Sequence, residues 1–262
     1  MPSFVLKACA IFRVLCLGLF VMAGISSANA DDNRLVLVGL QAPPYLYTDQ
    51  TGEPRGLLVE AITRASQRSG VPVDLVVSNW PRAQHEVKIG RADLIFPVVF
   101  TPDRQDWLEY PDDPVIRFEM MVFARVDPDF AFNGQVETLH GLRIGKIAKG
   151  RMHPEFRRLE ESGKAEIEGR DTLEQLITAA HHSRLDAFVT PRLMTLWTIE
   201  KMQLDTVQAF ETPLGVSDIF IGFSRMSQKR AAWQKLLEEL ESLESYKADY
   251  LASLSSGQRN KF

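Results

Sequence analysis

The feature that most constrains the fold is an alternation of apolar, β-branched segments with amphipathic segments, which passes along the chain twice. In the first pass, strands are predicted at 34–39, 71–77 and 92–96, and the residues between the first two place their apolar side chains on one helical face. The alternation stops at Pro111-Asp112-Asp113-Pro114 and then resumes. Repeated strand–helix units predict parallel sheets covered by helices, so two passes predict an α/β fold with two lobes.

The second pass continues to the end of the sequence. Strands are predicted at 119–125, 142–147, 187–190 and 217–224, and helices at 153–162 and from Pro191 onward. A capping box, Asp171-x-x-Glu174, predicts a further helix that runs to about His182. One long final helix is expected, because five apolar residues share a helical face: Trp233, Leu236, Leu237, Leu240 and Leu243.

The N-terminus has the pattern of an export signal. Lys7 and Arg13 supply its positive charge, an apolar run follows at 14–25, and Ala28-Asn29-Ala30 forms a small-residue cleavage site. We therefore expect residues 1–30 to be a signal peptide whose removal releases a soluble periplasmic protein. The alternative, a retained membrane anchor, is disfavoured because the uncharged run is short for a bilayer span.

The composition of the secreted chain limits its partners. Removing Lys7 and Arg13 from 30 basic residues leaves 28 against 34 acidic residues, a net charge of −6. This balance argues against a nucleic-acid or anionic-membrane partner. Both cysteines, Cys9 and Cys16, lie in the predicted signal, so the secreted chain would depend on an ordinary hydrophobic core rather than on disulfides.

Motifs for catalysis or for cofactors are missing from the sequence. His85-Glu86 lacks the second histidine of a His-Glu-x-x-His zinc site, and the adjacent His181 and His182 point to different helix faces. There is no Gly-x-Ser-x-Gly elbow, no Gly-x-Gly-x-x-Gly and no phosphate-binding loop. We therefore expect no cofactor, no bound metal and no enzymatic activity.

A short stretch has the residues of a small-molecule cleft wall. Trp80-Pro81-Arg82-Ala83 supplies an aromatic ring, residues 90–97 supply a buried strand, and Thr101-Pro102-Asp103-Arg104 supplies a guanidinium. Thr101 is expected to cap the short helix that carries Arg104, with Pro102 in its first turn. In open α/β sheets the ligand lies beyond the carboxyl ends of the strands, which is where these side chains fall.

Further motifs follow in order along the chain. Together with the stretch just described, their order and spacing resemble the periplasmic solute-binding proteins of family 3, the polar amino acid type, over essentially all of the predicted secreted chain. These motifs are Ala42-Pro43-Pro44-Tyr45, Gly52, Gly56-Leu57-Leu58-Val59, His140-Gly141-Leu142-Arg143-Ile144-Gly145 and Arg184-Leu185-Asp186-Ala187-Phe188-Val189.

The resemblance implies a type II periplasmic binding protein in which two α/β lobes trap a ligand between them. It places the first lobe at 31–116 and 218–262 and the second lobe at 117–217. The chain would cross between the lobes near 111–117 and 215–218. Such proteins usually deliver their ligand to a membrane permease driven by ATP hydrolysis, and we expect this one to be a monomer.

The resemblance also assigns residues to the site. Arg104 matches the family arginine that grips a ligand carboxylate; the alternative is a surface arginine paired with Asp103 or Glu109. Tyr45 and Trp80 match positions from which side chains reach the cleft, and their alternative is packing between strand ends and helices. The sequence does not decide whether Arg82 faces the cleft.

Three departures from the family pattern change the expected ligand. Pro97 and Val98 stand where amino acid binders place hydroxyl and backbone donors, and Pro97 has no N–H to donate. Arg151 replaces a Ser/Thr position, and Thr190 stands where many members have a carboxylate against an α-ammonium. An ammonium closed in without a counter-charge is costly, so we expect an organic anion rather than a zwitterion.

The predicted site comprises seven residues, and three functions remain open. The residues are Arg104, Trp80, Tyr45, Pro97, Val98, Arg151 and Thr190, with Arg151 on a surface loop as the alternative for that position. The leading function is the capture of a small polar or anionic solute, a carboxylate or an amino acid-like molecule, between the two lobes for delivery to an ABC-type permease. The alternatives are a sensor module and an enzyme on the same scaffold that resembles the dehydratases of aromatic biosynthesis, for which Asp218 is the nearest candidate acid.

Overall fold

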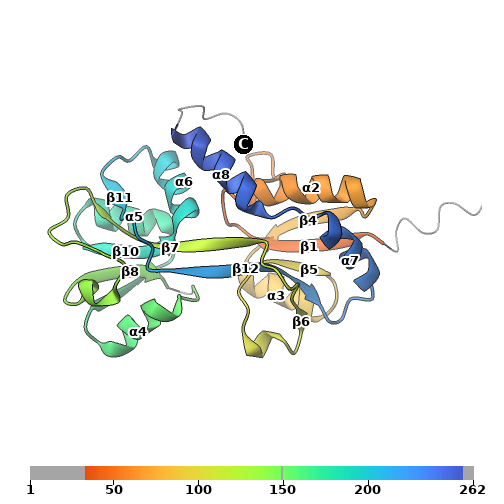
Figure 1. Cartoon of the computed structure of the whole chain (residues 1–262), viewed down its shortest axis with the longest axis horizontal. Helices are drawn as coiled ribbons and strands as arrows, with labels where there is room; N and C mark the ends of the chain where they lie inside the picture. The colour runs from red at the N-terminus through yellow and green to blue at the C-terminus, as the bar shows by residue number, and fades with distance from the viewer. Residues whose placement is uncertain (1–32, 149, 256–262) are drawn as a thin grey trace, which may run out of the picture.

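Two long antiparallel strands, β7 (Ile116–Arg125) and β12 (Gly215–Ser224), run through both halves of the molecule (Figure 1). The computed structural model describes residues 33–148 and 150–255. In it the strand order is β4-β1-β5-β12-β7-β10-β8-β9, with β6 and β11 attached at the sides. β7 and β12 pair with each other from Ile116 opposite Ile219 to Met120 opposite Gly215. Beyond this ladder β12 joins β5, and β7 joins β10, so each strand belongs to both halves.

The half that we call the first lobe contains the first pass of the sequence and its C-terminal helices (Figure 1). Its central strands β4, β1 and β5 are parallel, as predicted, and β12 closes them on one side in the antiparallel sense. The elements of the first lobe are β1 (Leu35–Leu40), β2 (Tyr47–Thr48), β3 (Pro54–Arg55), α2 (Leu57–Ser69), β4 (Val73–Ser78), α3 (Trp80–Lys88), β5 (Leu94–Val98), η1 (Pro102–Arg104), β6 (Leu108–Glu109), α7 (Arg230–Glu239) and α8 (Leu243–Ser255).

The second lobe is formed mainly by the residues that lie between β7 and β12 in the sequence. Its strands β10, β8 and β9 are parallel, and β7 borders β10 in the antiparallel sense. The elements of the second lobe are η2 (Val136–Leu139), β8 (Arg143–Ile147), α4 (Pro154–Ser162), β9 (Glu166–Arg170), α5 (Leu173–His181), β10 (Ala187–Pro191), α6 (Arg192–Met202) and β11 (Val207–Ala209).

Each sheet separates two hydrophobic cores, because successive residues of a strand point to opposite faces. In β1, Leu35 and Leu37 enter one core of the first lobe, and Val38 enters the core on the other face. In β10, Ala187 and Val189 face one core of the second lobe, and Phe188 faces the other. The predicted apolar face of α2 is confirmed: Leu58, Ala61, Ile62 and Ala65 are all buried.

Two of the expected helix features are wrong. The final helix is broken into α7 and α8, because the amide of Leu243 donates to Val115 O at 2.9 Å and Ser242 Oγ accepts from the amide of Glu244 at 3.3 Å. The cap of α5 is Thr172 rather than Asp171, and Thr172 Oγ1 accepts from the amide of Gln175 at 3.3 Å. The helix breaks because these hydrogen bonds compete with a continuous helix, and the cap of α5 shifts by one residue because the Thr172 hydroxyl reaches the amide of Gln175.

Asp93 fixes the start of β5 to two other parts of the first lobe. The residue is only 4 % exposed, and its two carboxylate oxygens accept hydrogen bonds from the amide of Val36 at 2.8 Å and from Ser227 Oγ at 2.6 Å. Lys229 Nζ lies 3.3 Å away. The carboxylate therefore connects β1, β5 and the turn before α7.

Replacing Asp93 with asparagine is expected to lower the free energy of unfolding by about 2 kcal/mol, since hydrogen bonds to charged groups contribute about 1.5–3 kcal/mol each. The amide would also present N–H groups to donors that need an acceptor. Urea unfolding measures the change. Asp74→Asn is the control, because Asp74 pairs with Arg34 on the exposed edge and its loss should cost less than about 1 kcal/mol. Equal losses in both variants would contradict the role given to Asp93.

The predicted export signal, with Cys9 and Cys16, lies outside the described residues. Within the part of the chain that the structure describes, no helix has the length and apolar character needed to cross a bilayer.

Candidate functional site at the lobe junction

Arg104 lies half-buried at the carboxyl edge of the first sheet, where the predicted guanidinium was expected. Thr101 is extended and Pro102 opens the 3-10 turn, so the amide of Arg104 donates to Thr101 O at 3.0 Å. The side chain then turns back over the end of β5, and Nη1 donates to Val99 O at 3.0 Å. This bond occupies one nitrogen of a group that carries five N–H donors.

Trp80 stacks on this guanidinium. Asn79 caps α3 by accepting a hydrogen bond from the amide of Arg82 at 3.0 Å, and Pro81 lies in the first turn, which fixes Trp80 directly after β4. The Cζ atom of Arg104 lies 4.9 Å from the centre of the Trp80 ring, within the range of a cation–π interaction. The loops that follow β4 and β5, the strands on either side of β1, therefore bring the two predicted side chains together.

Two aromatic side chains that the sequence analysis missed complete this surface. Tyr110 donates its hydroxyl to Val99 O at 3.2 Å, so one carbonyl accepts from both Tyr110 and Arg104. Phe100, which is exposed, packs edge-on against the Tyr110 ring with 5.3 Å between centroids. The only signal in the sequence was that Tyr110 precedes the Pro111 break, which does not predict its return to Val99.

The electrostatics of the site favour an anion. Burial lowers the pKa of the Arg104 guanidinium, and the positive charge of Arg151 lowers this pKa further. Arginine nevertheless stays charged in proteins. Burial also raises the pKa of the Tyr110 hydroxyl, which therefore stays neutral at physiological pH. The site thus presents a partly dehydrated cation beside a neutral phenol.

Arg151 reaches this site from the second lobe. It follows β8, and its Nη1 lies 3.9 Å from Oδ1 of Asp103 in η1. The contact is longer than a hydrogen bond, and the side chains are 51 % and 71 % exposed, so the pair contributes little to stability. Its position is more informative than its energy, because it brings two arginines, one from each lobe, to the same place.

A second set of contacts joins the lobes through α6. The ring of Trp197 lies 5.6 Å from that of Tyr47 in the β2–β3 hairpin, measured between centroids. Leu193 is buried in a core of the first lobe, and Met194 packs against it. Figure 1 shows α6 beside α8 at the upper side of the junction.

Three of the predicted site residues are packed inside the lobes instead. Tyr45, Val98 and Thr190 are each 1 % exposed. Tyr45 stacks on Phe118 at 4.9 Å, and the hydroxyls of Thr190 and Thr195 lie 2.7 Å apart. In this structure their side chains stabilise the folds of the lobes and do not reach the surface of the junction.

The remaining candidates lie near Arg104 in different settings. Pro97 is half-buried in β5. Arg82 is 73 % exposed and its Nε lies 4.0 Å from Glu86 Oε1, so it belongs to the outer surface of α3. Thr101 Oγ1 is buried and makes no hydrogen bond of good geometry with a described residue, although this hydroxyl lies near Asp103 and lowers the pKa of that carboxyl. A buried hydroxyl beside η1 without such a bond costs free energy unless water or a ligand satisfies it.

Cavities of about 460 to 510 Å³ lie near this site and elsewhere. One of about 510 Å³ is formed at the carboxyl ends of β1 and β4, directly before Trp80; its lining residues are Leu40, Gln41, Thr48, Val77, Ser78 and Asn79. Another, of about 460 Å³, adjoins α5 around Arg170 and Arg184. A third, also of about 510 Å³, lies where the segment before β7 meets the connection between α7 and α8. Among the described residues, no group of three or more His, Cys, Asp or Glu side chains is placed to hold a metal ion.

The chain is similar to known solute-binding and sensor proteins. Residues 35–251 match the family model of the bacterial extracellular solute-binding proteins, family 3. The L-cystine-binding protein TcyA of Bacillus subtilis (strain 168) is 23 % identical over 171 residues, which cover 64 % of this chain and 61 % of TcyA. The chain thus aligns with somewhat less than two thirds of the length of that relative.

Solved structures agree on the fold. A histidine kinase sensor domain with similarity to periplasmic binding proteins superposes with a TM-score of 0.67 at 19 % identity, covering 86 % of this chain and 96 % of that one. An ancestral arginine-binding protein bound to arginine gives 0.65 at 16 % identity, with coverage of 87 % and 99 %. The fold is therefore that of a type II periplasmic binding protein. Since the family model spans nearly all of the described residues, the chain belongs to the bacterial extracellular solute-binding proteins, family 3.

Proposed function

We propose that this protein is a periplasmic solute-binding protein that captures a small organic anion between its two lobes and delivers it to an ABC-type permease. In this proposal residues 1–30 are a cleaved export signal. The lobes comprise residues 31–116 with 218–262 and residues 117–217, and the protein works as a monomer. β7 and β12 act as the hinge, because these strands connect the lobes.

The observation that carries the proposal is the setting of Arg104. Its guanidinium is half-buried, is stacked on Trp80 and is held by Val99 O, so it is pre-oriented while still having donors to offer. A planar guanidinium grips a carboxylate with two parallel N–H bonds, and the exclusion of water by a closed junction strengthens the pair. Thr101 offers a nearby hydroxyl that makes no hydrogen bond of good geometry with a described residue.

A ligand that contacts Arg151 as well as Arg104 would favour closure of the two lobes. Its contact with Asp103 is long and exposed, and a ligand carboxylate between the two arginines would replace it with shorter charge-assisted bonds. A ligand that touches both lobes favours the closed arrangement over the open one, and no bond is made or broken. The exposed ring of Phe100 provides an apolar surface for the body of such an anion.

A thermal-shift screen followed by calorimetry tests the proposal. The panel includes benzoate, phenylacetate, succinate and citrate, together with amino acids, polyamines and sugars. We expect carboxylates without an ammonium group to raise the Tm most, because Arg104 and Arg151 both lie at the site and, among the described residues, Asp103 is the carboxylate paired with Arg151. Micromolar affinity for a simple amino acid, with no response to the carboxylates, would refute the anion proposal.

A sensor role is the second candidate, and the similarity to a histidine kinase sensor domain supports it. A sensor would present its closed form to a membrane receptor instead of releasing ligand to a permease. Pull-down of the ligand-bound protein on membranes distinguishes the two by the partner recovered. Catalysis has less support, because Asp218 pairs with Arg117 at 3.0 Å on the crossover strands, and incubation with prephenate or arogenate is expected to yield no product.

A further inference from the structure

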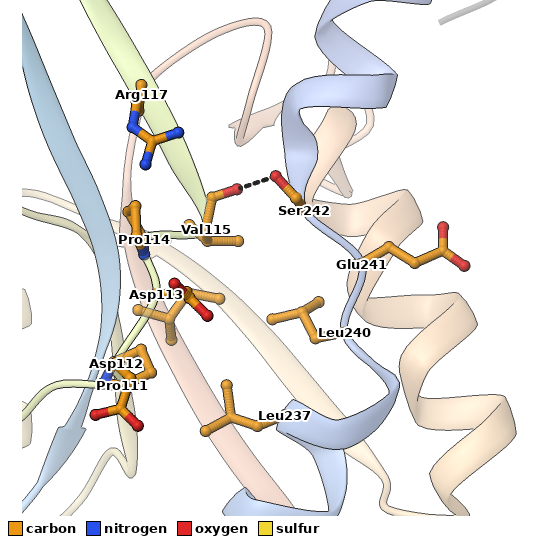
Figure 2. A pocket seen from close by; sticks show the side chains of 11 residues that line it. Pro111, Asp112, Asp113, Pro114, Val115, Arg117, Leu237, Leu240, Glu241 and Ser242 are labelled. Atoms are coloured by element: carbon orange, nitrogen blue, oxygen red, sulfur yellow. Dashed lines mark hydrogen bonds between the residues drawn. The ribbon is translucent and has the colours of Figure 1, made fainter.

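A cavity of about 510 Å³ lies behind the junction, where the first crossover strand begins (Figure 2). Three parts of the chain that are distant in sequence form its walls: the segment before β7 with the start of that strand, one residue of β12, and the end of α7 with its connection to α8. None of them belongs to the Arg104 site. The lining residues are Pro111, Asp112, Asp113, Pro114, Val115, Arg117, Ile221, Leu237, Leu240, Glu241 and Ser242.

The floor of this cavity is apolar. Val115 and Ile221 are buried in the core of the first lobe, and Leu237 and Leu240 are half-buried at the end of α7. Figure 2 shows Leu237 and Leu240 on one side of the cavity and Val115 opposite them. Such a floor can take up the aliphatic or aromatic body of a small molecule, as the floors of most ligand pockets do.

The uncompensated charge at the rim is negative. Arg117 pairs with Asp218 at 3.0 Å, and Glu241 pairs with Arg68 at 2.7 Å, so these two charges are already neutralised. In Figure 2 the carboxylate of Glu241 points away from Asp113. Asp112 and Asp113 are exposed, and no hydrogen bond or ion pair with another described residue engages either carboxylate. An apolar floor beneath two unpaired carboxylates suits a molecule with the opposite charge.

We propose that this cavity binds a small organic cation: a primary ammonium group, attracted by the negative charge of Asp112 and Asp113 at the rim, attached to an apolar body that covers Val115, Leu237 and Leu240. The cation faces the carboxylates from solvent, so it keeps part of its hydration and avoids the cost of complete burial. The site is independent of the anion proposed at Arg104, and its charge preference is opposite.

Its position also connects it with the hinge. Val115 donates its amide to Ile219 O at 2.9 Å, and Ile221 follows two residues later in β12. An occupant therefore contacts both crossover strands and the α7–α8 connection at once. Molecules bound here are placed to change how freely the strands twist, without entering the space between the lobes.

Chemical-shift titration of the ¹⁵N-labelled protein tests the proposal with hexylammonium as the probe. We expect saturable shifts of the amide signals of Val115, Glu241 and Ser242, and none from hexanoate. The double variant D112N/D113N should bind the probe roughly fivefold more weakly, because two exposed charge pairs, each weak on its own, are lost. Raising the salt to about 1 M should have a similar effect, since the Debye length falls to about 3 Å.

Asp205→Asn is the matched control, because Asp205 is also exposed but lies in the second lobe, away from the cavity. It should bind hexylammonium as the unaltered protein does. Shifts confined to Trp80 and Arg104 would place the probe at the other site and overturn the proposal. Equal binding of hexanol and hexylammonium that D112N/D113N leaves unchanged would overturn the cationic class, and the absence of saturable shifts at the three amides would overturn the site itself.

Discussion

Replacing Arg104 with methionine is expected to weaken carboxylate binding by about 3 kcal/mol or more, roughly a hundredfold in Kd, because two charged hydrogen bonds are lost. Methionine keeps much of the apolar length of the side chain and can still pack on Trp80. Arg104→Lys should have an affinity between those of the unaltered protein and Arg104→Met, since lysine restores the charge but not the planar pair of donors. Calorimetric titration with the best carboxylate of the panel measures all three proteins.

Arg82→Met is the matched control for this prediction. Arg82 lies near Trp80 in the chain and carries the same charge, but its side chain is 73 % exposed on the outer face of α3. Its removal should leave Kd within about twofold, as expected of an exposed charge. A comparable loss of affinity in both variants would show that the general positive charge of the lobe, rather than Arg104, holds the ligand.

The second large effect is expected at Gly56, which precedes α2 with φ of 119°. A Cβ atom there would lie 2.5 Å from the carbonyl oxygens of Pro44 and Tyr45. These oxygens accept the first free amides of α2, from Leu57 and Leu58, at 3.0 and 2.9 Å. Gly56→Ala should therefore cost about 3 kcal/mol, because it adds backbone strain and displaces the carbonyls that cap the helix.

Differential scanning calorimetry measures this loss, and Gly52→Ala is its control. Gly52 also has a positive φ, of 87°, but no atom lies within 4 Å of the Cβ that alanine would add. Gly52→Ala should therefore lower the free energy of unfolding by only about 1–2 kcal/mol, the cost of placing a residue with a Cβ atom at a positive φ. A loss of 3 kcal/mol corresponds to a fall in Tm of about 6–12 °C for a chain of this size. Equal falls in Tm would mean that the contacts with Pro44 and Tyr45 relax without cost.

The sequence predicted those elements of the fold that bury a regular apolar pattern. The strand expected at 187–190 is β10 (Ala187–Pro191), and the helix expected at 153–162 is α4 (Pro154–Ser162). The pattern missed β9 (Glu166–Arg170), because an edge strand with a polar composition shows little alternation. It also missed the break between α7 and α8, because Leu243 continues the apolar face while its amide bonds to Val115 from the start of β7.

The site was predictable where a motif fixes a residue relative to a strand end. Trp80 and Arg104 each follow a parallel strand by only a few residues, and a proline close to each restricts the backbone there. Their contact therefore follows from the topology of the sheet. Tyr45 shows the limit of this reasoning: a tight turn, in which its amide donates to Ala42 O at 2.9 Å, directs the ring onto Phe118 and into the core. The contact of Arg151 with Asp103 depends on how the two lobes sit, which no local pattern records.

The shared strand β12 has a consequence for how the polypeptide is made. β5 lies between β1 and β12, and the core beside it contains Leu35 together with Trp233 and Tyr250. A nascent chain therefore cannot complete its first sheet until its last quarter has been synthesised. If export threads the chain through a narrow channel, late pairing of β12 favours passage, because the residues before β12 cannot complete their sheet and stay unfolded until β12 has been made.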